Sequence, residues 1–442
     1  MRIGIVGGGI AGLTAGHRLA AAGHDVTLFE AESELGGQAG TFAIAGTRLE
    51  RFYHHLFHSD TTVLDLIEEL GLGDRMVWNE NRAGYLYGGH VYDLATPLDL
   101  LRFGPLPFHA RIILGLQTLW LQQFGDWRKL EKLTAKEWVL KHGPRSIYDV
   151  VWGALLQSKF GDYADQVSMA WLLTKIQVRR SSNREFGETL GYMMGSFQLL
   201  IDALGHSIEE HGGQVHLSSP VERVLIENGR IQGLAVRKAD DLREHRFDAV
   251  IMTVGSPVVL RIAPDLPEEL RSLLASQVYQ GAQVMVLELN SSLVPYYWLS
   301  VPEPGIPFVV TLEHTNFVRE EHYQGRRIVY IGSYLSPDHP QYALSQEELL
   351  ALYTPYLQQL NPDFAPSWVI HSWLFRDPYG QPIITPNYST QMPPHLTGIE
   401  GLYLANTTQI YPEDRGINYA VLLGNTIATI VQGGEARASN RW

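Results

Sequence analysis

The first thirty residues, MRIGIVGGGIAGLTAGHRLAAAGHDVTLFE, contain the pattern that decides the fold. Residues 2–6 are apolar and predict a short buried strand. Three glycines follow in the spacing GxGxxG, namely Gly7, Gly9 and Gly12. Residues 10–22 have the apolar periodicity of a helix, and residues 25–29 predict a second strand that Glu30 follows directly. The order of strand, glycine turn, helix and strand is typical of a parallel α/β sheet.

Each glycine of this turn has a physical role in binding a dinucleotide. Gly7 permits the tight turn, Gly9 lets the backbone approach a pyrophosphate, and Gly12 lets the helix pack closely. The pyrophosphate then lies at the positive N-terminus of the helix. The carboxylate of Glu30 is placed to accept hydrogen bonds from the ribose hydroxyls, and it would repel a 2′-phosphate.

Two further segments carry a resemblance to a known family. Residues 36–41, GGQAGT, resemble the GGxxxT signature of the amine-oxidase-type flavoproteins, which include monoamine oxidases, protoporphyrinogen oxidases, carotenoid desaturases and, more distantly, UDP-galactopyranose mutases. Residues 401–406 and 415–420 resemble the last strand and the opening of the last helix of that superfamily. The resemblance implies FAD as the cofactor. The chain has no cysteine and no recognisable histidine attachment motif, so we expect the FAD to be non-covalent.

The resemblance also implies which residues bind FAD. These are Gly7, Gly9, Ile10, Ala11, Gly12, Glu30, Ala31, Gly36, Gly37, Gln38, Thr41, Val221, Asn406, Gly416, Ile417 and Asn418. Gln38 departs from the family, which usually has a basic residue there. Arg48 or Arg51 is expected to supply the missing charge, and the sequence alone does not choose between them.

Length and composition agree with a large α/β enzyme. A single hydrophobic core rarely extends beyond about 250–300 residues, so a chain of 442 residues predicts at least two domains. The expected fold is a discontinuous Rossmann-like FAD-binding domain over residues 1–80, 196–256 and 395–436. An α+β substrate-binding domain, with a helical cap and a mixed sheet, is expected over residues 81–195 and 257–394.

Charge and residue content exclude several functions. The formal net charge of −13 opposes binding to nucleic acid. No cysteine is available for disulfides or thiolate metal sites, and the three histidines between His54 and His58 lack a matching set of acidic ligands, so no metal site is expected. No signal peptide is recognised at residues 1–8, and a cytoplasmic location is expected.

Three residues are the candidate catalytic groups. In monoamine oxidases a strand of the substrate domain carries a lysine near the flavin, and Gln283 stands at the corresponding place in this sequence. This difference disfavours ordinary amine oxidation. His55 and Tyr379 lie in segments that resemble those facing the flavin ring in the family, although packing roles remain open for both. Arg376 and Arg415 are each expected either to bind a substrate anion or to pair with the neighbouring aspartate.

The leading hypothesis is an FAD-dependent oxidoreductase that oxidises a sizeable apolar or conjugated small molecule by hydride transfer to the flavin. Since no second dinucleotide motif is found, the electrons are expected to pass to oxygen, a quinone or another acceptor. The alternative is a flavin-dependent mutase that acts on a nucleotide sugar without net redox change. The sequence does not indicate an oligomeric state.

The segment 105–127, PLPFHARIILGLQTLWLQQFGDW, predicts a helix with a wide apolar stripe. It contains too many polar residues to span a membrane. We expect the stripe to be buried against the substrate domain, with peripheral membrane contact as the alternative.

Overall fold

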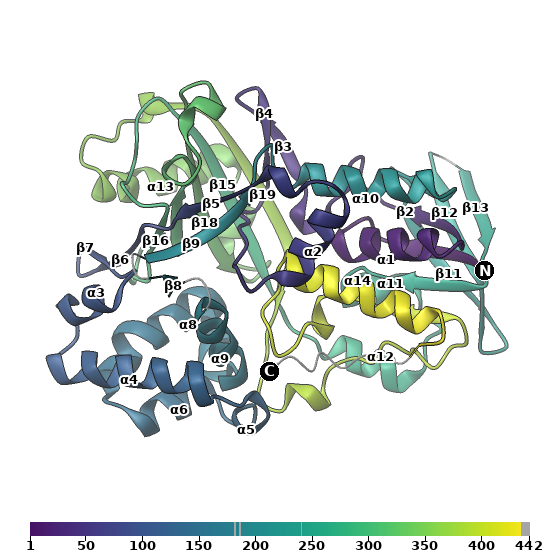
Figure 1. Cartoon of the computed structure of the whole chain (residues 1–442), viewed down its shortest axis with the longest axis horizontal. Helices are drawn as coiled ribbons and strands as arrows, with labels where there is room; N and C mark the ends of the chain where they lie inside the picture. The colour runs from purple at the N-terminus through teal and green to yellow at the C-terminus, as the bar shows by residue number, and fades with distance from the viewer. Residues whose placement is uncertain (181–182, 185–186, 240, 435–442) are drawn as a thin grey trace.

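A five-stranded parallel sheet is the centre of one half of the molecule in the computed structural model, which describes residues 1–180, 183–184, 187–239 and 241–434 (Figure 1). Its strand order is β10, β2, β1, β14, β20, and every neighbouring pair is parallel. The strands are β10 (Gln214–His216), β2 (Asp25–Phe29), β1 (Arg2–Val6), β14 (Ala249–Met252) and β20 (Leu402–Leu404). This order confirms the predicted Rossmann-like α/β fold.

Three helices cover one face of this sheet: α1 (Ile10–Ala21), α10 (Gln198–Glu210) and α14 (Ile417–Val431). Figure 1 shows α1 between the other two, and α1 contacts both. The other face packs against α11 (Ser256–Ile262) and an antiparallel sheet of β11 (Val221–Glu227), β12 (Arg230–Lys238) and β13 (Asp241–Arg246). Asn228 and Gly229 join β11 to β12 with positive φ angles of 51° and 73°, as a type I′ turn requires.

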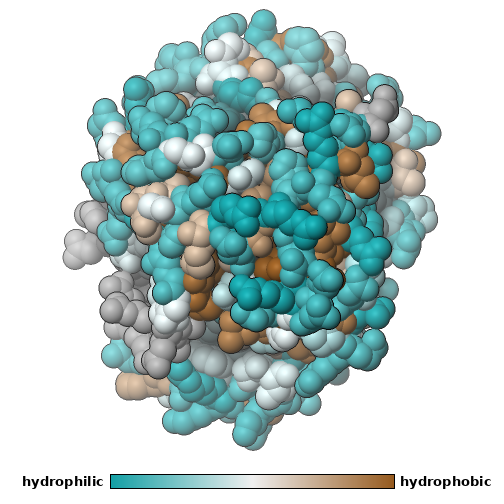
Figure 2. All heavy atoms as spheres, turned by 90° about the vertical axis from the view of Figure 1, so that its right-hand side faces the viewer, coloured by the Kyte–Doolittle hydropathy of each residue, from teal (hydrophilic) through white to brown (hydrophobic). Residues whose placement is uncertain are grey.

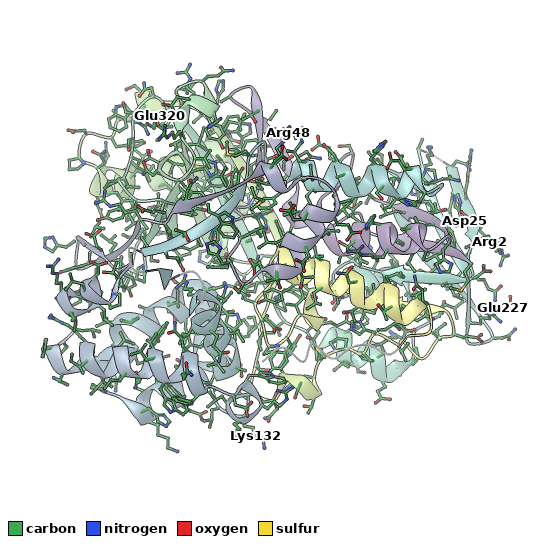
Figure 3. All side chains as sticks on the ribbon, in the orientation of Figure 1. Arg2, Asp25, Arg48, Lys132, Glu227 and Glu320 are labelled. Carbon is green, nitrogen blue, oxygen red and sulfur yellow. The ribbon has the colours of Figure 1, made fainter. Side chains whose placement is uncertain are left out.

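The strand order reverses between β1 and β14, which is where this fold class binds ligands. Arg2 and Asp25 mark the amino-terminal ends of β1 and β2 and lie at the outer end of the molecule (Figure 3). The carboxyl ends of the strands therefore face the rest of the chain. The outer end carries mainly hydrophilic side chains with small apolar groups between them (Figure 2).

A seven-stranded sheet forms the second half of the molecule, in the order β19, β15, β18, β17, β16, β6, β7. All pairs are antiparallel except β16 with β6. The strands are β19 (Val369–Pro382), β15 (Tyr279–Leu289), β18 (Arg327–Leu335), β17 (Val310–Glu313), β16 (Trp298–Ser300), β6 (Ala83–Tyr87) and β7 (His90–Asp93). Helix α13 (Gln346–Leu360) packs on one face and begins with a capping box of Ser345 and Glu348. The residue boundaries of the two predicted domains remain a prediction, and residues 435–436 lie outside the described residues.

Helices over residues 97–177 form a separate cap with its own core (Figure 1). Its longest member, α4 (Phe108–Phe124), corrects the expectation of a buried stripe. Ala110, Leu114 and Leu121 are buried, whereas the apolar stripe faces outward. The exposed side chains are Phe108, Ile112, Leu116, Leu119, Trp120 and Phe124, together with Leu98 and Leu101 of α3 (Pro97–Arg102). None of the described helices is long and apolar enough to cross a membrane.

Candidate active site

Two helices present uncapped N-termini at the carboxyl edge of the parallel sheet. Helix α1 begins after Gly9 and α14 begins after Gly416, and neither glycine has a side chain to cap the helix. Neither first turn contains an acidic residue. The free N–H groups and the helix dipole make each terminus a favourable place for negative charge.

The glycine turn leaves open space where a dinucleotide would lie. A Cβ atom built on Gly9 would meet only the Cα atom of Gly37, at 4.0 Å. A Cβ atom on Gly12 would lie 2.1 Å from the carbonyl oxygen of Gly7. Gly12 is therefore needed for packing, whereas Gly9 keeps a space open beside the N-terminus of α1, where Ile10 and Ala11 form the first turn.

Glu30 lies at the end of β2 with its carboxylate fixed by the backbone. Oε2 accepts a hydrogen bond from the N–H of Gly8 at 2.7 Å, and Oε1 accepts one from the N–H of Glu32 at 2.9 Å. Each carboxylate oxygen keeps a further lone pair for a ligand hydroxyl. Ala31 is exposed next to it, and Val221 begins β11 as a buried residue.

The segment with Gly36 and Gly37 runs beside the glycine turn, and Gly36 forms a parallel bridge with Gly9. Gln38 turns toward the second sheet, where its Nε2 donates to Oδ2 of Asp377 at 2.8 Å and to the carbonyl oxygen of Tyr379 at 3.1 Å. Gln38 thus joins the segment that contains Gly36 and Gly37 to β19 of the second sheet.

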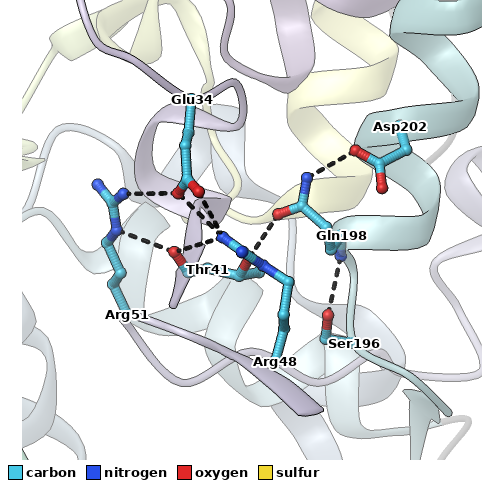
Figure 4. Close-up of polar contacts among 7 residues, drawn as sticks. All are labelled: Glu34, Thr41, Arg48, Arg51, Ser196, Gln198 and Asp202. Atoms are coloured by element: carbon cyan, nitrogen blue, oxygen red, sulfur yellow. Dashed lines mark hydrogen bonds and ion pairs between the residues drawn. The ribbon is translucent and has the colours of Figure 1, made fainter. Parts of the chain in front are cut away.

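Arg48 and Arg51 both form ion pairs with the carboxylate of Glu34 (Figure 4). Arg48 donates to both carboxylate oxygens of Glu34 at 2.9 Å, and Arg51 donates to Oε2 at 3.2 Å. Thr41 lies in the same network and donates to Gln198. Both arginines share the single carboxylate of Glu34, and the expectation that one of them replaces the family's basic residue stays a prediction.

Asn406 and Asn418 use their side chains within the protein. Oδ1 of Asn406 accepts from the N–H of Thr408 at 3.1 Å, and its Nδ2 donates to the carbonyl oxygen of Val254 at 3.1 Å. Oδ1 of Asn418 accepts from the N–H of Val63 at 3.0 Å and so ties α14 to α2 (Thr61–Glu69). These two side chains position the segments that carry them, and Ile417 is buried beside Asn418.

A cavity of about 40 Å³ lies where the segment after β4 (Thr47–Glu50) meets the second sheet and the start of α14. Its walls are mostly apolar or aromatic, with one histidine, one serine and one arginine. The lining residues are Phe52, Tyr53, His54, Ala282, Val284, Gly332, Ser333, Tyr334 and Arg415. At this cavity the second sheet meets Arg415, which directly precedes the N-cap of α14.

The histidines after Phe52 point to different partners. Nδ1 of His54 bonds the carbonyl oxygen of Phe52 at 2.6 Å, Nδ1 of His55 lies 3.1 Å from the hydroxyl of Tyr297, and His58 stacks on Trp78. Burial lowers the pKa of His54 to about 4 and that of His55 to about 3. Both rings are neutral at pH 7. The cavity is lined by His54 and not by the predicted His55.

The structure does not bring Gln283 into this cavity. Side chains alternate along β15, so Ala282 and Val284 face the cavity and Gln283 faces away from it, toward the short 3-10 helix Pro340–Ala343 that precedes α13. There Gln283 exchanges hydrogen bonds with Gln341 at 3.2 Å. Tyr379 lies beside Gly255 and Gln38. A Cβ atom built on Gly255 would be 3.6 Å from the Tyr379 ring, and the carbonyl oxygen of Tyr379 accepts a hydrogen bond from Gln38.

A charged cluster beside the cavity was not predicted from the sequence. Asp414 accepts an ion pair from Lys159 at 3.0 Å and a second from Lys175. Lys159 is on α8 (Gly153–Phe160) and Lys175 on α9 (Met169–Gln177), so the cap meets the C-terminal segment here. A single lysine within the apolar stretch MAWLLTKIQ was the available signal.

These features fit a flavin dinucleotide. Two uncapped helix N-termini, an open glycine cradle and a fixed carboxylate are arranged around the reversal of strand order. The sequence profile of the family described as flavin containing amine oxidoreductase matches residues 10–431. The chain belongs to this family.

Its relatives in the flavin containing amine oxidoreductase family include desaturases. The 15-cis-phytoene desaturase of Glycine max is 26% identical over 285 residues, which is 60% of this chain and 49% of the relative. The chain spans about half the length of the curated relatives it matches. The family's description names flavin-containing oxidoreductases.

Solved structures share the fold. A putative protoporphyrinogen oxidase from Exiguobacterium sp. 255-15 has a TM-score of 0.75 at 19% identity, with 98% of this chain and 99% of that chain covered. A reduced UDP-galactopyranose mutase has a TM-score of 0.73 at 14% identity, with 98% and 95% covered. At these identities the likeness establishes the fold and not the substrate.

Proposed function

We propose that the protein is an FAD-dependent dehydrogenase, oxidase or desaturase that acts on a sizeable apolar or conjugated small molecule. The observation that carries the proposal is the mostly apolar and aromatic cavity at the start of α14. When bound, the flavin supplies the chemistry by accepting a hydride from a C–H or N–H bond of the substrate. The protein has to hold the substrate and exclude water.

The cavity residues suit these tasks. Phe52, Ala282 and Val284 offer apolar contact, and the neutral ring of His54 adds no charge at pH 7. Gly9 and the N-terminus of α1 would hold the pyrophosphate, Glu30 the ribose, and the N-terminus of α14 the electron-rich side of the flavin. We expect non-covalent attachment, because the sequence has no cysteine for a thioether link and no recognisable histidine attachment motif.

Anaerobic mixing tests the reaction class. A porphyrinogen, a carotene and an amine are each added to the purified yellow protein, and loss of flavin absorbance is followed. We expect bleaching by a porphyrinogen or carotene but not by the amine. If no candidate bleaches the flavin while dithionite does, the proposal fails. Turnover of UDP-galactopyranose only after prereduction would instead identify a mutase, and flavin retained on the denatured chain would contradict non-covalent binding.

We also propose that the exposed face of α3 and α4 rests on a membrane surface without crossing it. Eight large apolar side chains gather there, at 40–67% exposure. Contiguous apolar surface of this kind marks an interaction site more often than scattered single residues do. A membrane surface would deliver an apolar substrate to the adjoining cap.

A further inference from the structure

The charges around the cavity do not balance. Lys159, Lys175 and Arg415 surround a single carboxylate, that of Asp414. Oδ2 of this carboxylate accepts the two lysines and Oδ1 accepts from Gln381 Nε2 at 3.1 Å, and neither oxygen accepts a hydrogen bond from Arg415. The cluster therefore has more cations than it has anions to pair with them.

Arg415 is the cation without a partner. Its Nε atom is buried and unbonded, and none of the described residues accepts a hydrogen bond or ion pair from its guanidinium group. Asp377 is the other carboxylate whose field reaches Arg415. It is occupied by Gln38 and by the N–H of Tyr379, each at 2.8 Å.

A buried unpaired cation is costly, since desolvation is not offset by a counter-charge. The ion pairs of Asp414 are with Lys159 and Lys175, so they do not offset the cost of burying Arg415. Burial acts to raise the pKa of Asp414, but Lys159 and Lys175 outweigh it and keep that pKa low. Burial also lowers the pKa of Lys175 to about 8, as expected for a cation that shares one carboxylate with another. An additional anion would relieve all three cations.

The cavity next to Arg415 has the size and the donors for such an anion. Its volume of about 40 Å³ exceeds the roughly 10–15 Å³ that one water needs. The hydroxyls of Tyr53 and Tyr334 are 3.2 Å apart, so one O–H donates to the other and one remains free to donate. The Tyr334 ring is 5.4 Å from Lys159 Nζ and 5.9 Å from the guanidinium carbon of Arg415.

We propose that Arg415, with Tyr53 and Tyr334, binds an anionic oxyacid group of the substrate, either a carboxylate or a phosphate monoester. This inference rests on the proposed function, and it makes the substrate an amphipathic molecule with an apolar body and one anionic end. A planar guanidinium binds such a group through two parallel hydrogen bonds. Lys159 and Lys175 support the site through the electrostatic field.

Equilibrium binding to the oxidised holoenzyme tests the inference without turnover. Decanoate, decyl phosphate and uncharged decanol are titrated by calorimetry and by the flavin spectrum. We expect at least one anion to bind at least about tenfold more tightly than decanol, as for a charged hydrogen-bonded pair. The two anions distinguish carboxylate from phosphate recognition. Equal affinities for all three probes would overturn the inference, even if no variant were made.

Variants locate the binding group. Arg415→Gln is expected to abolish the preference for the anion and leave decanol binding unchanged, and Arg415→Lys is expected to restore part of it. Arg376→Gln is the matched control, because this exposed arginine donates to the carbonyl oxygen of Leu344. If Arg415→Gln fails to fold, Lys159→Met is used, and an anion preference of unchanged size in it would count against the site.

A flavin role for Arg415 is the competing outcome. If Arg415→Gln loses bound flavin while the wild-type protein shows no preference for anions, the guanidinium serves the cofactor and the inference is overturned. Failure of the redox screen leaves these affinities untouched, so the proposed function and this inference fail separately.

Discussion

Gly9 and Gly12 differ in what a methyl group at each would meet. Gly9→Ala places the methyl in the open space beside α1, at a φ of −74° that alanine accepts. We expect the apoprotein to keep its melting temperature and FAD affinity to fall by at least about tenfold, or ~1.4 kcal/mol. Calorimetry with FAD measures the affinity. Unchanged FAD affinity would show that the pyrophosphate lies elsewhere.

Gly12→Ala is the contrasting variant. Its methyl would lie 2.1 Å from the carbonyl oxygen of Gly7, so the turn itself has to move. We therefore expect this change to lower the melting temperature of the apoprotein as well as its FAD affinity.

Glu50 makes the stability depend on pH. It is buried beneath Tyr192 and accepts from its hydroxyl at 3.0 Å, and burial raises its pKa from 4.5 to about 7. Between these pH values the native state keeps a proton that the unfolded chain has lost, so the free energy of unfolding falls as pH rises. We expect Glu50→Gln to flatten the decline in melting temperature from pH 5 to pH 8.

The control for this comparison is Glu68→Gln, an exposed position on α2. It is expected to keep the slope of the unmodified protein. Equal slopes for the Glu50 variant and the unmodified protein would show that Glu50 does not set the pH dependence.

At the scale of elements, α4 gives the clearest test. Leu116 and Leu119 are 62% and 63% exposed at the middle of its outer face. We expect the unmodified protein to float with liposomes, and Leu116→Asp with Leu119→Asp to reduce the floating fraction strongly, since charge opposes insertion of this face. Leu242→Asp, at a 53% exposed leucine of β13, is the control. Protein that stays at the bottom with neutral and anionic vesicles alike would contradict membrane contact.

Elements whose pattern is local were predictable. The glycine turn, the hairpin at Asn228 and the capping box at Ser345 depend on the chemistry of a few neighbouring residues. Which side chains of β15 line the cavity was not predictable, because every position from Gln280 to Leu289 is buried. With no polar side to the strand, a shift by one residue exchanges Gln283 for Ala282 at the cavity.

At the scale of the whole molecule, the flavoprotein fold followed from motifs near both ends of the chain. The cluster around Asp414 did not, since Lys159 and Lys175 reach it from helices more than 230 residues earlier in the sequence. Local patterns carry no information on such convergence. The outward stripe of α4 was mistaken for core because periodicity identifies an apolar face without saying what covers it.

The parallel sheet also has a consequence for biosynthesis. Its central strand β1 pairs with β14, β14 pairs with β20, and α1 packs against α14. The contacts of the N-terminal elements are therefore completed only after α14 has been synthesised. At about 5–20 residues per second, synthesis up to α14 takes roughly 20–80 seconds. Until that point β14 lacks its neighbour β20 and α1 lacks its neighbour α14. The parallel sheet and the helices that cover it are therefore complete only when translation has nearly ended.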